Sequence, residues 1–157
     1  MMMTLMRNFM AAAAALAVCA LCAPARADLL VSADTNAVSF GTARIADLDR
    51  GFIELSPSSM SYDLRISVQD TGPVDWTITM RADSEYFMSD NSSDKPCGDL
   101  LWRVNGTGGY APATTLDENM VSGTGDAILD YDFILNTGWE DAPGRYGLTV
   151  VFTIVEN

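Results

Sequence analysis

The sequence predicts an all-β protein, a single antiparallel, immunoglobulin-like β-sandwich of about seven to eight strands. Apolar and polar residues alternate along most of the chain, which indicates strands that bury one face. Clusters of Gly, Pro, Asn and Ser separate the alternating segments, and no amphipathic helix of useful length lies between them. Strands joined by turns rather than by helices favour antiparallel sheets that pack face to face.

Residues 1–27 have the features of a signal peptide. A basic start is followed by an apolar run over residues 10–22, and the tripeptide Ala-Arg-Ala at 25–27 has the small-x-small form of a cleavage site. We therefore predict an exported protein whose mature chain begins at Asp28, with residues 28–157 forming the sandwich domain. An uncleaved N-terminal anchor is the alternative. The apolar run is short for a membrane span, so we expect no span in the mature chain.

The mature chain is acidic and has a single cysteine. Removing the leader leaves 130 of the 157 residues and takes away two arginines but no acid, so the formal charge goes from −12 to −14. A chain of this length can form one domain with its own core. Its charge repels nucleic acid and anionic lipid, so we expect no nucleic-acid partner. Cys97 has no partner for an intramolecular disulfide, and we expect a buried thiol, with pairing between chains as the alternative.

The first half of the mature chain contains the clearest strands. Shorter strands are predicted at residues 28–32, 37–41 and 51–55. Residues 60–69 and 74–82 then alternate strictly, and an Asp-Thr-Gly-Pro turn joins them, so we predict a hairpin whose apolar faces are buried. The inward residues of this pair are Tyr62, Leu64, Ile66, Val68, Val74, Trp76, Ile78 and Met80.

The second half alternates long loops with strands. Residues 83–99 are polar and turn-rich, and residues 100–106 form a strand in which Trp102 shares the core face. A flexible Gly-rich segment follows, and strands are predicted at 127–135 and 145–156. In the last strand Tyr146, Leu148, Val150, Phe152 and Ile154 lie on one face. Tyr146 also has the position of the tyrosine at a sandwich corner, whose hydroxyl bonds to nearby backbone.

The residue types exclude most familiar catalytic systems. The chain has no histidine, which removes Ser-His-Asp and Cys-His nucleophilic systems and the commonest general base near neutral pH. One mature cysteine also excludes a Cys-rich zinc site. A pair of carboxylates could cut glycosides, but no pair among the 21 acids is marked as buried or opposed. We predict that the protein is not an enzyme and that it needs no cofactor. Ca²⁺ is the one ion for which the sequence offers a candidate site.

The loop at residues 83–99 is the candidate Ca²⁺ site. Ca²⁺ prefers hard oxygen donors on a flexible loop. The spacing matches no EF-hand, and acids gather in many exposed loops without binding metal, which is the favoured interpretation. The candidate ligands are Asp83, Glu85, Asp90, Asp94 and Asp99, together with Asn91.

Two segments carry a family resemblance. "VQDTGPVDWTITM" at 68–80 resembles the V-x-D-x-x-G-x-x-x-W-x-L-T segment of WxL-type bacterial cell-surface domains, with Trp76 as the Trp and Ile78 in the Leu position. "APGRYGLTVVFTI" at 142–154 is similar to the closing strand of that family, with Tyr146 matched and Phe152 where a second Trp would stand. The same closing pattern occurs in pilin-like and spore-coat-U-like sandwiches. The resemblance implies an exported bacterial β-sandwich with a surface or assembly role.

Two functions follow from these observations. The leading one is an exported structural or adhesive protein of the cell surface, periplasm or extracellular space, with other surface proteins, further copies of itself or cell-wall glycan as partners. Its final strand would pair with another chain if it lay at a sheet edge, and would not if it lay inside the sheet. The alternative is a carbohydrate- or Ca²⁺-binding module, in which Trp102, Tyr110 and Trp139 would stack on sugar rings, although alternation favours a core position for Trp102.

Overall fold

The computed structural model describes residues 29–55, 62–70, 72, 74–92 and 94–157. The predicted signal peptide and the predicted first mature residue, Asp28, lie outside the described residues. No helix in the described part of the chain is both long and apolar enough to cross a membrane.

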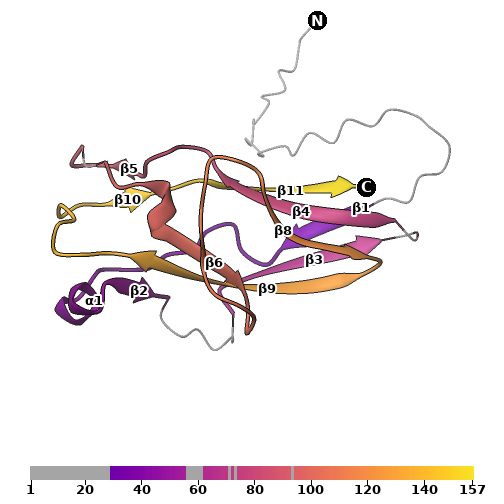
Figure 1. Ribbon diagram of the computed structural model, residues 1–157, viewed down its shortest axis with the longest axis horizontal. Coiled ribbons are helices and arrows are strands. Elements are labelled where there is room, and N and C mark those ends of the chain that lie inside the picture. The colour runs from indigo at the N-terminus through magenta and orange to yellow at the C-terminus, as the bar shows by residue number, and fades with distance from the viewer. Residues whose placement is uncertain (1–28, 56–61, 71, 73, 93) are drawn as a thin grey trace, which may run out of the picture.

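The prediction of an all-β antiparallel sandwich is confirmed, because strands dominate the described chain and every paired strand runs antiparallel in two packed layers (Figure 1). Within the described residues, helical structure is limited to α1 (Ile45–Arg50) and a 3₁₀ turn, η1 (Cys97–Asp99). The strands are β1 (Leu29–Ala33), β2 (Phe52–Glu54), β3 (Leu64–Asp70), β4 (Asp75–Ala82), β5 (Met88–Ser89), β6 (Leu100–Val104), β7 (Ala111–Pro112), β8 (Glu118–Thr124), β9 (Ala127–Asn136), β10 (Tyr146–Gly147) and β11 (Val150–Glu156).

The strands form one large sheet, one small sheet and a short ribbon. The large sheet has the order β1-β3-β9-β6-β7, and β2 also pairs with β9. The small sheet has the order β11-β4-β8, and β10 pairs with β5 as a ribbon of two strands. The immunoglobulin-like strand order stays a prediction.

The predicted hairpin of residues 60–69 and 74–82 is wrong, because β3 and β4 belong to different sheets. The Asp70 carboxylate accepts hydrogen bonds from the N–H groups of Gly72 and Val74 at 2.9 and 3.0 Å, which turns the chain out of the large sheet. The N–H of Asp70 donates to Asp126, next to the matching turn between β8 and β9. Alternation reports only that one face is buried, so it fits a hairpin and a crossing between sheets equally well.

The core lies between the two sheets. The inward residues of β3 and β4 are buried as the alternation predicts, with Met80 fully inaccessible and Ile78 1% exposed. Tyr131 of β9 is also fully inaccessible, and its ring meets Trp102 edge-on, with the ring centroids 6.5 Å apart. The other central members of this cluster are Leu64, Ile66, Val68, Trp76, Phe87, Leu100 and Phe133.

Two further predictions from the sequence are wrong. Residues 37–41 form no strand; the Thr35 hydroxyl instead bonds the backbone of Ala37 in both directions, which makes a local turn. The segment at residues 106–119, expected to be flexible, contains β7 and the start of β8, and no strand was predicted over the rest of β8. This strand was missed because only Met120 of its seven residues is buried, so it has no alternating apolar face.

Candidate interaction surface

The small sheet has two free edges, β11 on one side of β4 and β8 on the other. β11 pairs with β4 from Val150, opposite Ala82, to Glu156, opposite Trp76. Among the described residues, neither β11 nor β8 pairs with any strand besides β4. The sequence left open whether the final strand lies inside a sheet or at its edge, and the structure places it at an edge.

The hydrogen bonds at the two ends of β11 fix which backbone groups face the free edge. The N–H of Asp83 donates to the carbonyl of Thr149 at 3.0 Å, and the N–H of Asn157 donates to the carbonyl of Asp75 at 2.8 Å. Backbone direction alternates along an antiparallel strand, so the odd-numbered residues of β11 bond to β4. The residues that direct N–H and C=O groups to the free edge are Val150, Phe152, Ile154 and Glu156.

The side chains of β11 divide between the core and the solvent. Val150, Phe152 and Ile154 are half-buried and pack against the core cluster. Thr153 and Val155 are exposed on the outer face of the sheet. The same residues therefore supply the free backbone groups and the partly covered apolar side chains. A strand added to this edge would form hydrogen bonds and bury apolar surface together.

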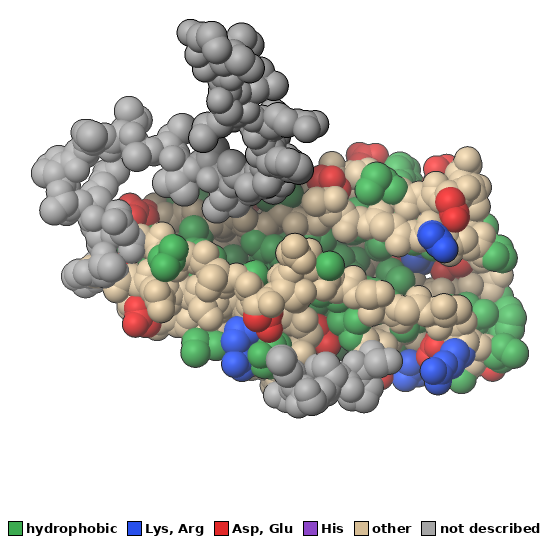
Figure 2. Space-filling view, turned by 180° about the vertical axis from the view of Figure 1, so that it is seen from behind, with side chains coloured by type: hydrophobic (Ala, Val, Ile, Leu, Met, Phe, Trp, Pro, Cys, Tyr) green, Lys and Arg blue, Asp and Glu red, His purple; other side chains and the backbone are tan. Residues whose placement is uncertain are grey.

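β1 borders the same side of the sandwich as β11. The β3–β4 and β8–β9 turns both cross between the sheets, so β3 lies over β4 and β9 over β8. β1 is the neighbour of β3, as β11 is of β4, and among the described residues β1 pairs only with β3. Leu29 of β1 is half-buried against the core. Seen from behind, the surface is hollowed between the two layers, and hydrophobic side chains are visible in the hollow (Figure 2).

The two edges of the small sheet differ in how they are protected. Natural edge strands commonly carry charges, Pro or bulges that prevent pairing with other chains. β8 begins with Glu118 and contains a bulge, because its register shifts between Ile78 and Thr79 of β4 with Met120 as the extra residue. The β11 sequence VVFTIVE has no Pro and no charge before its last residue. The free edge of β11 is therefore the better surface for pairing with another chain.

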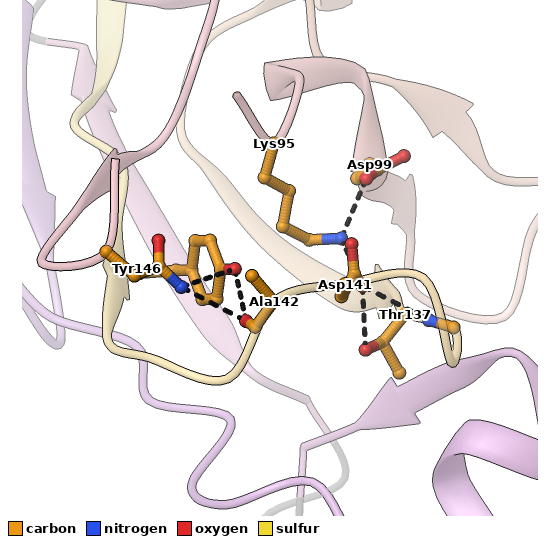
Figure 3. Close-up of polar contacts among 8 residues, drawn as sticks. Lys95, Asp99, Thr137, Asp141, Ala142 and Tyr146 are labelled. Atoms are coloured by element: carbon orange, nitrogen blue, oxygen red, sulfur yellow. Dashed lines mark hydrogen bonds and ion pairs between the residues drawn. The ribbon is translucent and has the colours of Figure 1, made fainter. Parts of the chain in front are cut away.

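The corner that precedes β11 is held by side-chain hydrogen bonds to backbone (Figure 3). The Tyr146 hydroxyl donates to the carbonyl of Ala142. The Asn91 amide donates to the carbonyls of Ala142 and Pro143 at 3.2 and 2.7 Å, and to the Tyr146 oxygen at 3.2 Å. Asp90 accepts from the N–H of Arg145 at 2.8 Å. These bonds tie the β9–β10 loop to the segment after β5 and fix where the C-terminal strands begin.

A buried ammonium group lies next to this corner. The Lys95 side chain is 2% exposed, and its Nζ lies 2.7 Å from Asp99 and 2.9 Å from Asp141 (Figure 3). Asp141 also accepts from the Thr137 hydroxyl at 3.0 Å and from the N–H of Gly138 at 3.1 Å. Lys95 thus joins the segment before η1 to the loop after β9.

Burial and pairing act in opposite directions on the pKa values of this cluster. Burial alone would lower the pKa of Lys95, but the hydrogen bonds and charges of Asp99 and Asp141 outweigh it and raise the pKa above its ordinary value. Burial alone would raise the pKa of Asp141, but the hydrogen bonds from Lys95, Gly138 and Thr137 together hold the pKa below its ordinary value. Lys95 and Asp141 are therefore both charged near neutral pH.

The structure spreads the five candidate Ca²⁺ ligands over several contacts. Asp99 pairs with Lys95 and Asp90 binds the Arg145 backbone, while the side chains of Asp83, Glu85 and Asp94 belong to exposed residues. In the part of the chain that the structure describes, no three His, Cys, Asp or Glu side chains come close enough together to hold a metal ion. Calcium binding at residues 83–99 stays the untested alternative to an acidic loop that binds no metal.

The aromatic residues singled out from the sequence have different surroundings. Trp76 is 2% exposed and its indole N–H donates to the carbonyl of Gly125 at 2.9 Å. Trp102 is 8% exposed, so it belongs to the core. Tyr110 is half-buried under the Arg103 guanidinium, whose carbon lies 4.5 Å from the ring centroid. Trp139 is 65% exposed.

Sequence reasoning missed Lys95, and it gave Asn91 a possible role as a Ca²⁺ ligand but not its contacts at the Tyr146 corner. Lys95 is the only lysine of the chain and lies among acids, and this was the available signal for an ion pair. Its two partners are 4 and 46 residues away, so only the fold shows that both reach it. Asn91 lies in a loop rich in Asn, Ser and Asp, and nothing in its spacing from Tyr146 indicates contact.

Comparison with known proteins finds no family model that matches the chain, and no curated protein is similar to it.

Proposed function

We propose that this protein is an exported, non-enzymatic structural or adhesive subunit that assembles through the free edge of β11. Its partners would be further copies of itself or other proteins of the cell surface, periplasm or extracellular space. The observation that carries the proposal is the unprotected edge of β11, which turns the backbone groups of Val150, Phe152 and Ile154 toward solvent beside half-buried apolar side chains.

Three features of the sequence support the same class of function. The leader at residues 1–27 supports export. The absence of histidine argues against the commonest hydrolytic mechanisms. The resemblance of the segments around Trp76 and Tyr146 to WxL-type and pilin-like sandwiches supports a surface or assembly role.

The register of the small sheet offers a matched pair of variants that tests the proposal. Thr77 of β4 lies between Val155 on one side and Ser122 on the other, and all of these positions are on the outer face. A lysine at an edge strand opposes pairing with another chain. The test compares Thr153→Lys/Val155→Lys on β11 with Asn119→Lys/Ser122→Lys on β8. The two double variants are matched because each places its lysines opposite Thr79 and Thr77 of β4, from opposite sides of that strand.

Protein isolated after export is analysed by mild-lysis gels for ladders and by light scattering during size-exclusion chromatography. We expect the parent to form multimers or complexes, the β11 variant to be monomeric, and the β8 variant to assemble like the parent. Thermal unfolding of both variants controls for loss of fold. A parent that is monomeric in exported material, or equal effects of the two variants on assembly, would contradict the proposal.

A further inference from the structure

A polar cavity lies at the end of the sandwich where β9 leaves the large sheet. It has a volume of about 530 Å³ and is bordered by α1, by the segment around η1 and by the loop that follows β9. Sites for small ligands commonly have volumes of about 300–1,000 Å³. The polar and aromatic side chains that line it include Lys95, Asn136, Thr137, Trp139, Glu140 and Asp141.

The wall formed by residues 137–141 is held in place by hydrogen bonds within the protein. Lys95 forms an ion pair with Asp141, and Asp141 in turn accepts hydrogen bonds from the Thr137 hydroxyl and the N–H of Gly138. The N–H of Asp141 also donates to the carbonyl of Gly138 at 3.2 Å. A site whose backbone is fixed before a ligand arrives loses less conformational entropy on binding.

Trp139 projects from this wall and is 65% exposed, unlike the other two tryptophans of the chain. Its indole N–H donates to the Asp49 carboxylate at 3.2 Å, which ties the ring to α1. The ring is thus both accessible and oriented. An exposed, oriented indole offers a flat apolar face with a polar edge, and such rings are typical of surfaces that recognise amphipathic ligands.

The polar groups of the cavity both donate and accept hydrogen bonds. Asn136 has an amide, Thr137 a hydroxyl and Glu140 a carboxylate, whose two oxygens lie within 2.5 Å of where a Cβ on Gly138 would be. A hydroxyl group is both donor and acceptor, so a polyhydroxyl ligand matches this mixture better than a simple cation, which only needs acceptors. The cavity is lined by three carboxylates, those of Asp99, Glu140 and Asp141, and by one ammonium group, that of Lys95. The excess of negative charge repels anionic ligands.

We propose that this cavity binds a neutral glycan, with one sugar ring stacked on Trp139 and its hydroxyl groups bonded to Glu140 and Asn136. The site is built from other elements than the edge of β11. The proposed assembly and glycan binding are therefore separate properties, and each can fail without the other.

The test uses the purified mature protein, an array of neutral glycans and, for each positive glycan, titration calorimetry. Acrylamide quenching of tryptophan fluorescence gives a second readout, because Trp76 and Trp102 are buried and quenching reports mainly on Trp139. Trp139→Ala removes the stacking face, and Glu140→Gln removes a charge while keeping the acceptor oxygen. Leu116→Ala is the matched control, since Leu116 is 71% exposed and lies outside the cavity.

We expect at least one neutral glycan to bind saturably and to protect Trp139 from acrylamide. The affinity should fall about tenfold or more in Trp139→Ala, equivalent to about 1.4 kcal/mol, and should be unchanged in Leu116→Ala. The Thr153→Lys/Val155→Lys variant should bind like the parent. Absence of saturable binding across the array would overturn the proposal. So would unchanged affinity in Trp139→Ala, or preferential binding of choline, which would indicate a cation site.

Discussion

The two edge strands of the small sheet, β8 and β11, both pair with β4 but differ in how far they are protected against pairing with another chain. Two features of β8 fit this chain alone. Gly123 lies so close to the Trp76 ring that a Cβ there would come within 2.7 Å of it, and a bulge interrupts the register of the strand at Met120. On β11 the core side is left half-covered, with Phe152 and Ile154 partly exposed beside free backbone groups. Both edges are therefore unpaired in the described chain, but the β8 edge is protected by an acid and a bulge, while another strand can still pair with the β11 edge.

The largest expected effect concerns the strand that both edges share. Trp76→Ala should lower the free energy of unfolding by about 3–5 kcal/mol, because it empties a fully buried site. Phe152→Ala on β11 should lower it by only about 2 kcal/mol in the monomer, since Phe152 is half-buried. Both values are measured by chemical denaturation of monomer and of assembled protein.

The same two variants test whether another strand covers the edge of β11 in the assembly. If a partner strand covers β11 in the assembly, the effect of Phe152→Ala should grow on assembly while that of Trp76→Ala stays constant. An unchanged Phe152→Ala effect would mean that the edge of β11 is not the assembly surface.

The contrast between the edges also explains what the sequence could reveal. The predicted strand at 145–156 is divided into β10, which pairs with β5, and β11, which pairs with β4. The β11 part was predictable because Val150, Phe152 and Ile154 recur at every second residue and pack against the core. β8 was not, because an edge protected by Glu118, Gly123 and a bulge contains few apolar residues. Alternation also could not show that β3 and β4 belong to different sheets. The pairing of strands depends on contacts between distant segments, and a local sequence pattern contains no information about those contacts.

The candidate sites were predictable to the same extent. The exposed Trp139 and the corner position of Tyr146 were visible in the sequence. The cavity beside Trp139 was not, since it needs α1, Lys95 and the β9–β10 loop to meet. The buried Lys95 was hidden for the same reason, because Asp141 lies 46 residues further along the chain.

An effect smaller than that of Trp76→Ala is expected when the ion pairs that hold the loop after β9 are removed. Lys95→Met leaves Asp99 and Asp141 facing each other without a cation. It should lower the free energy of unfolding by about 3 kcal/mol or less, since both carboxylates are partly exposed. Hydrogen exchange should rise in residues 137–147, next to β11, and stay unchanged in β8. Faster exchange in β8 than in the β9–β10 loop would contradict this assignment.

The pH dependence of the Lys95 cluster follows from the signs of its pKa shifts. The pKa of Asp141 is lowered, so its contribution is complete above the ordinary value of 3.8 and is lost as the pH falls through the pKa of the folded state. The pKa of Lys95 is raised, so its contribution is complete below 10.5 and is lost as the pH rises through the folded value. The stability difference between parent and Lys95→Met should therefore be constant between these limits and shrink outside them. Urea unfolding across this range measures it.

The smallest expected effect is that of divalent cations on the acidic loop beside the Tyr146 corner. If residues 83–99 held Ca²⁺, binding to the folded state alone would add about 2.7 kcal/mol of stability at a hundredfold excess over Kd. We expect instead a small gain from charge screening, equal for Ca²⁺ and Mg²⁺ at matched ionic strength, because the described acids are spread over separate contacts. Thermal melts compare the parent with Asp90→Asn/Asp94→Asn, in which the amide oxygen at position 90 can still accept from the Arg145 N–H. Asp117→Asn/Glu118→Gln removes two charges at the start of β8 as the matched control. A Ca²⁺-selective rise of several degrees, abolished only by the first variant, would make this loop a metal site and would mean that an ion stabilises the β11 side of the sandwich.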